Sequence, residues 1–102
     1  MSVYILSGMR TPSGSFMGAL SSVAAPQLGG AAIKGALDKA GVSKSDVDEV
    51  FMGNVIQSGV GQAPARQASI SAGLGVHVPC TTLNKVCGSG LSLIHISEPT
   101  RR

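Results

Sequence analysis

Residues 47–67 read VDEVFMGNVIQSGVGQAPARQ, and this stretch joins a strand signal, a loop signal and a helix signal. Residues 50–56 are almost continuously apolar, as expected of a parallel strand that is covered on both faces. Two glycines and a proline within residues 59–64 predict a loop. Residues 65–72 consist mainly of small side chains and predict a helix, which the following glycines end. The stretch is therefore typical of the first half of a strand–helix–strand unit.

The flanking segments predict the same alternation. Residues 3–7, VYILS, form a short apolar run typical of a buried strand. Residues 26–40 begin with a proline and carry apolar side chains at three- and four-residue spacing, which predicts a helix that Gly41 ends. Residues 78–86 contain several β-branched side chains and predict a third strand. The order strand, helix, strand, helix, strand predicts an α/β fold, in which βαβ units build a mostly parallel sheet layer.

The composition suggests a segment that other parts of a larger protein cover. Of the 102 residues, 43% are hydrophobic and only 13% are charged. A small free-standing domain has much surface to solvate and normally carries more charge. Glycine is also frequent, at 14 residues.

Several classes of function and location have little support in the sequence. The formal net charge is +3, but the basic residues are scattered and Trp is absent, so nucleic-acid binding is disfavoured. The start, MSVYILSGMR, lacks the charged and long apolar regions of a signal peptide, and the apolar runs are too short to span a bilayer. Two cysteines are too few for a secreted disulfide framework. We therefore expect a cytoplasmic protein with neither a nucleic-acid nor a membrane partner.

Cys87 is the candidate nucleophile, because it lies where the third predicted strand ends and is followed by Gly88, Ser89 and Gly90. A tight strand-to-helix turn and the close approach of a substrate carbonyl both favour glycine. A helix that follows would favour the thiolate and supply N–H groups to an oxyanion. On these four residues alone, a buried cysteine in a glycine-rich turn is an equally good interpretation.

Three motifs, in this order and spacing, resemble one known family. They are RTPSGSFMGAL at residues 10–20, the stretch at residues 47–67, and VPCTTLNKVCGSG at residues 78–90. Together they resemble the amino-terminal half of the first domain of the thiolases, in particular the bacterial acetyl-CoA acetyltransferases known as biosynthetic thiolases. The resemblance covers residues 3–90.

This resemblance implies an acyl transfer through an acyl-cysteine, with Cys87 as the nucleophile and Gly88 as oxyanion or backbone support. Two acetyl-CoA molecules would give acetoacetyl-CoA and CoA, or the reverse thiolysis would occur. The family uses coenzyme A thioesters as substrates without a further cofactor or metal, and its full-length members form dimers or tetramers. Its activating histidine, second cysteine and Asn-bound water come from segments beyond this chain. His77, His95 and Cys80 match none of them.

The last residues depart from the family pattern. From Leu91 the chain reads LSLIHISEPTRR, where the family continues as a helix rich in Ala, Met and Lys. This run has a β-branched centre and a proline, and it does not predict an amphipathic helix. It resembles the translation of a transposase-end adapter used in sequencing libraries. We therefore divide the chain into a partial thiolase amino-terminal domain, residues 1–90, and a non-native tail, residues 91–102, and expect this chain itself to be an inactive fragment.

Two alternatives remain open. Another condensing enzyme of the same superfamily, such as a ketoacyl synthase, would also acylate a cysteine at a strand-to-helix turn. A non-catalytic α/β interaction module would instead use its apolar surface to bind a partner. NKVCGSG together with GQAPARQ favours the thiolase, and an ordinary, slow thiol at Cys87 would favour the module.

Overall fold

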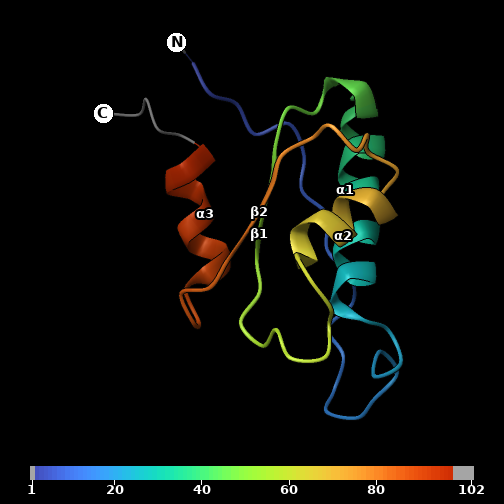
Figure 1. The fold of residues 1–102 in the computed structure, drawn as a ribbon. Coiled ribbons are helices and arrows are strands. Elements are labelled where there is room, and N and C mark those ends of the chain that lie inside the picture. The colour runs from blue at the N-terminus through green and yellow to red at the C-terminus, as the bar shows by residue number, and fades with distance from the viewer. Residues whose placement is uncertain (1, 98–102) are drawn as a thin grey trace.

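The computed structural model describes residues 2–97, which form helices on both sides of a pair of strands (Figure 1). The elements follow one another as α1 (Ala25–Ala40), a short 3-10 turn (Lys44–Asp46), β1 (Val50–Gly53), α2 (Pro64–Ser71), β2 (Cys80–Leu83) and α3 (Ser89–Ser97). In Figure 1, α1 and α2 lie on one side of the strands and α3 lies on the other. The predicted α/β class is confirmed.

The two strands pair in parallel, as the sequence predicts. Val50 lies opposite Cys80 and Gly53 lies opposite Leu83. The Asn54 amide donates to the Leu83 carbonyl at 3.0 Å and continues the ladder by one bond. Both strands are shorter than predicted, because the residues beyond Gly53 and Leu83 leave the strands, and β2 begins only at Cys80, after a turn in which the Val78 amide donates to the Gly75 carbonyl. The end of β2 matters, since it leads into the turn of Cys87.

Local sequence signals set both ends of α1. Pro26 lies in the first turn, where a missing N–H leaves no hydrogen bond unmade. The Gln27 side-chain oxygen accepts a hydrogen bond from the Ala24 amide at 3.2 Å. Gly41 ends the helix in the left-handed conformation, with φ of 69°, which glycine adopts without steric cost. The predicted helix and its stop are confirmed.

Small residues allow α1 and α2 to pack at backbone distance. A Cβ atom on Gly30 would come within 2.6 Å of the Ser71 hydroxyl oxygen, and one on Gly29 would come within 3.0 Å of the Ala68 methyl carbon. Ala68 is fully buried. Larger side chains at these positions would force the helices apart.

The helix α2 is tied directly to β2. The Ala65 amide, in the first turn of α2, donates to the Thr82 hydroxyl at 2.9 Å. This bond satisfies one of the amides that the start of a helix leaves without a backbone partner. The fold has a small core of four buried side chains with four partly buried ones packed against them: Val50, Ala72, Leu74 and Val78, then Ile33, Leu37, Val47 and Cys80.

The strand predicted at residues 3–7 does not form. Tyr4 is 77% exposed and Ile5 is 89% exposed, so this apolar run is not buried. The segment is instead held against α1, where the Ser7 hydroxyl donates to the Ala36 carbonyl at 2.6 Å. A strand requires a neighbour to pair with, and within residues 2–97 β1 and β2 pair only with each other. The local pattern alone could not supply this partner.

The run after Gly90, whose pattern does not predict an amphipathic helix, nevertheless forms a helix as far as residue 97, and residues 98–102 lie outside the described residues. The helix α3 covers Ser89–Ser97, and the Ser92 amide donates to the Gly88 carbonyl at 2.9 Å. The helix contacts β1. Intrinsic preferences of β-branched residues cost only a few tenths of a kcal/mol each, and packing against a strand outweighs them. A helix therefore does follow the candidate nucleophile.

Candidate active site

Cys87 lies in the turn that joins the carboxyl end of β2 to the start of α3. The side chain is exposed to solvent. The helix α3 begins two residues later, at Ser89, so the positive end of its dipole lies next to this turn. An accessible thiol at the amino end of a helix suits nucleophilic chemistry.

The residue before Cys87 has an unusual backbone. Val86 has φ of 52°, in the left-handed region. This conformation is rare for a β-branched residue and costs about 1–3 kcal/mol. Such strain persists only where surrounding contacts enforce it.

One buried hydroxyl group spans the turn. Ser89 is 4% exposed. Its hydroxyl donates to the Val86 carbonyl at 2.7 Å and accepts from the Lys85 amide at 2.8 Å. A serine hydroxyl can donate once and accept twice, so both bonds can exist together. They connect the chain before Cys87 to the chain after it.

A second side chain supports the turn from its other end. The Asn84 side-chain oxygen accepts from the Val86 amide at 2.8 Å. Its side-chain nitrogen donates to the Val55 carbonyl at 2.9 Å, in the loop after β1. Asn84 thus links the turn of Cys87 to a segment 29 residues earlier in the chain.

Gly53, the last residue of β1, lies against the start of α3. A Cβ atom at this position would stand 2.8 Å from the Gly90 amide nitrogen and 2.9 Å from the Ser89 Cβ. Real Cβ atoms essentially never come this close to another atom. No motif in the sequence points to Ser89 or Gly53, whereas the Asn-x-Val spacing before Cys87 is compatible with a side-chain turn at Asn84.

The Gly88 amide supports the turn in this structure. It donates to the Lys85 carbonyl at 3.1 Å. As an oxyanion donor, the same N–H would have to share or release this bond. The expected role of Gly88 as oxyanion or backbone support stays a prediction.

The other cysteine and a histidine lie away from this turn in the fold. Cys80 opens β2 and is half-buried, packed against the core, and its thiol donates to the Val78 carbonyl at 3.3 Å. His77 is exposed in the turn before β2. Cys80 therefore packs against the core.

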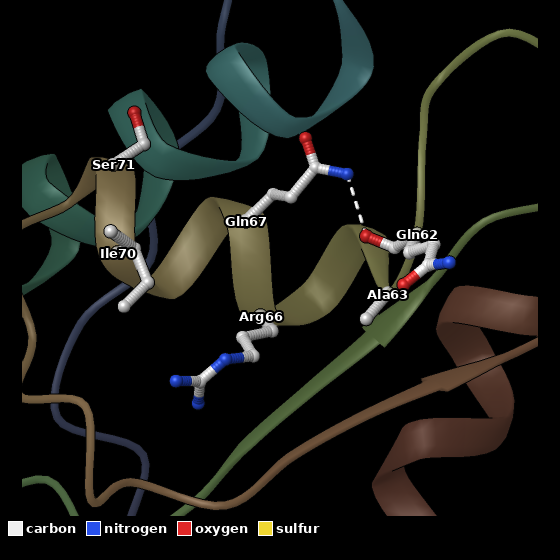
Figure 2. A pocket seen from close by; sticks show the side chains of 6 residues that line it. All are labelled: Gln62, Ala63, Arg66, Gln67, Ile70 and Ser71. Carbon is white, nitrogen blue, oxygen red and sulfur yellow. Dashed lines mark hydrogen bonds between the residues drawn. The ribbon is translucent and has the colours of Figure 1, made fainter.

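A hollow of about 510 Å³ lies on the outer side of α2 (Figure 2). The Gln67 side-chain nitrogen donates to the Gln62 carbonyl at 2.6 Å (Figure 2). It also donates to the Val60 carbonyl at 2.8 Å, so it ties the loop before α2 to the helix. Arg66 donates to the Val76 carbonyl at 3.2 Å and holds the loop after α2. The six lining residues are Gln62, Ala63, Arg66, Gln67, Ile70 and Ser71, so the hollow is separate from the Cys87 turn.

Two other kinds of feature are missing from residues 2–97. They contain no group of three or more His, Cys, Asp or Glu side chains arranged to hold a metal ion. Nor does any helix among them have the length and apolar character needed to cross a membrane.

Comparison with known proteins agrees with the motifs. The family model described as "Thiolase, N-terminal domain" matches residues 3–98. This match extends eight residues past Gly90, where the resemblance read from the sequence ends. The prediction that residues 91–102 are a non-native tail stays a prediction.

Curated relatives are similar over nearly the whole chain. The mitochondrial acetyl-CoA acetyltransferase of Mus musculus is 60% identical over 94% of this chain and 23% of the relative. A cytosolic acetyl-CoA acetyltransferase of Gibberella zeae is 60% identical over 90% of this chain and 23% of the relative. The chain thus spans about a quarter of the length of these relatives.

A solved structure has the same arrangement. The crystal structure of the Acat5 thiolase from Ascaris suum, in complex with coenzyme A, matches with a TM-score of 0.88. Its sequence is 40% identical, over 91% of this chain and 24% of that chain. From the family model, the relatives and this fold, the chain belongs to the thiolase family and matches the part that forms the amino-terminal domain.

Proposed function

We propose that this chain is the amino-terminal part of an acetyl-CoA C-acetyltransferase. The complete enzyme would condense two acetyl-CoA molecules to acetoacetyl-CoA and CoA, or catalyse the reverse thiolysis. The observation that carries the proposal is the position of Cys87, an exposed thiol in a strained turn between a parallel strand and the start of a helix. Relatives that bear this enzyme name support the choice of reaction.

The first half-reaction loads Cys87. Its thiolate attacks the carbonyl carbon of acetyl-CoA and forms a carbon–sulfur bond. The resulting oxyanion collapses, the bond to the CoA sulfur breaks, and CoA leaves as a thiolate that takes up a proton. Covalent catalysis of this kind replaces one difficult step by two easier ones.

The second half-reaction unloads the enzyme. A base removes a proton from the α-carbon of another acetyl-CoA, and this carbon attacks the acetyl-cysteine carbonyl. The new carbon–carbon bond gives acetoacetyl-CoA, and the Cys87 thiolate leaves. We assign the base to segments outside these 102 residues, so the chain alone would not catalyse the condensation.

The proposed partners are acyl-CoA and CoA, and the complete protein would be a dimer or tetramer. The Ascaris suum thiolase was crystallised in complex with coenzyme A, which supports the choice of substrate. Relatives include mitochondrial and cytosolic enzymes. For this protein we propose the cytoplasm, and the cytosolic relative from Gibberella zeae supports this location.

Mass spectrometry of the complete protein after incubation with acetyl-CoA tests this assignment. We expect one acetyl group on Cys87, and Cys87→Ala should abolish both synthesis and thiolysis. Cys87→Ser should be nearly as damaging, because a hydroxyl is far less acidic than a thiol. An acetyl group on Cys80, with none on Cys87, would contradict the proposal.

A further inference from the structure

The strained conformation of Val86 needs an explanation in contacts. Its side chain is 64% exposed, so packing of the valine does not hold the left-handed backbone in place. Its backbone groups, by contrast, are fully engaged. The amide donates to Asn84, and the carbonyl accepts from both the amide and the hydroxyl of Ser89. Two side chains therefore supply the bonds that favour this conformation.

We propose that Asn84 and Ser89 are positioning residues, which hold Val86 in its left-handed conformation and thereby fix the place of the Cys87 sulfur. The inference rests on the proposed function, because it concerns the acylation of Cys87. Neither residue needs to touch the substrate. Each acts through the backbone on either side of the nucleophile.

Ser89 contributes by closing the turn around Cys87. Its hydroxyl bonds to the Lys85 amide and to the Val86 carbonyl, so it holds the strand side of the turn from the helix side. The side chain is buried, and water cannot easily replace it as donor or acceptor. Ser89→Ala would leave the Lys85 amide without this partner.

Asn84 contributes by anchoring the turn to the rest of the fold. One end of its carboxamide bonds to the Val86 amide, and the other end bonds to the Val55 carbonyl. A serine at this position would keep an acceptor for the amide two residues on but lose the bond to Val55. Asn84→Ala would lose both bonds. The pair of variants separates local support of Val86 from anchoring to the loop after β1.

Without these bonds, Val86 should relax to a conformation with negative φ, and Cys87 should move away from its reactive place. The loss of one or two of these hydrogen bonds, at the buried Ser89 or at the exposed Asn84, predicts an acylation rate about tenfold lower. Glycine adopts the left-handed region without strain. In a Val86→Gly protein, the left-handed conformation does not need these hydrogen bonds to hold it. The same substitutions should therefore lower the acylation rate by less than about threefold.

A double-mutant cycle in the complete protein tests the proposal. The variants are Ser89→Ala, Asn84→Ala and Asn84→Ser, each made with Val86 and with Val86→Gly. The measurement is the single-turnover rate and amplitude of acetyl transfer from acetyl-CoA to Cys87, by rapid quench and mass spectrometry. Ser58→Ala removes an exposed hydroxyl from the loop after β1 and is the matched control, which should keep the wild-type rate.

The expected result is a lower rate at unchanged amplitude for Ser89→Ala and Asn84→Ala, with partial retention in Asn84→Ser and rescue by Val86→Gly. A merely structural role would lower the amplitude, through loss of folded protein, and would not be rescued. If Ser89→Ala does not fold, the comparison of Asn84→Ala with Asn84→Ser, at an exposed side chain, tests the proposal. Equal losses in both backgrounds, or no loss in either, would overturn the inference. Failure of the wild-type protein to acylate Cys87 would instead count against the proposed function.

Discussion

Replacing Gly53 with alanine tests how closely β1 and the turn of Cys87 are packed. The added Cβ atom would stand 2.8 Å from the Gly90 nitrogen and from the Ser89 carbonyl carbon, about 0.6 Å inside the 3.4 Å at which ordinary contact begins. Both neighbours are backbone atoms, which cannot turn aside as a flexible side chain can. The first turn of α3 would therefore have to move.

The expected size of the effect follows from this geometry. Overpacking of this kind typically costs about 1–3 kcal/mol of stability. Displacement of a reacting group by about 1 Å can cost roughly a hundredfold in rate. We expect Gly53→Ala to lower the acylation rate of Cys87 by at least about tenfold, even in molecules that remain folded.

Denaturant unfolding and single-turnover acylation of the complete protein measure the two effects separately. Gly8→Ala is the matched control, because a Cβ atom there would meet nothing within 4 Å among the described residues and Gly8 lies outside the turn of Cys87. An alanine there should leave acylation unchanged and be neutral or stabilise by up to about 1 kcal/mol. Wild-type stability and acylation in Gly53→Ala would refute the close contact between β1 and α3.

Two other outcomes follow from the structure. Cys80→Ser should lower stability by about 1–3 kcal/mol, because it places a hydroxyl against the core, while the acylation rate of Cys87 stays unchanged in the same quench assay. The 102-residue chain alone should aggregate, because residues such as Tyr4, Ile5 and Phe16 are exposed. It should also give no condensation, because the proposed base lies outside it. Size-exclusion chromatography checks the aggregation, and a monomer with a cooperative thermal transition would contradict it.

The parts of the fold that local chemistry determines could be predicted from the sequence. Pro26 and Gly41 bracket α1 because proline suits a first turn and glycine suits a left-handed stop. The parallel pairing of β1 and β2 also followed, because apolar runs separated by a helix pattern need a crossover connection. These signals depend on neighbours within a few residues.

The errors arose where distant parts of the chain decide the outcome. Residues 3–7 have the composition of a strand, but a strand also needs a partner, which the described residues do not provide. Residues 91–97 have a poor helical pattern, yet contact with β1 accompanies a helix there. A local sequence pattern does not show which distant segment a run of residues will pack against.

The residues of the candidate site also differ in whether local or long-range contacts place them. Cys87 could be proposed as the nucleophile from the three motifs together, because its glycine-rich surroundings alone fit a buried cysteine equally well. Gly53 could not be identified, because its contact with Ser89 joins segments 36 residues apart. The bond from Asn84 to Val55 was equally hidden, because it spans 29 residues, whereas the bond from the Val86 amide to Asn84 is local and fits the Asn-x-Val spacing.

The hydrogen bond between the Ala65 amide and the Thr82 hydroxyl has a consequence for cooperativity. The helix α2 has eight residues, and its N-cap, Ala63, offers no side-chain oxygen. A helix this short is marginal in isolation. Its first turn instead depends on a hydroxyl from β2, the strand that leads to Cys87. Helix and strand therefore belong to one cooperative unit, and local unfolding that opens α2 also releases the support of the nucleophile.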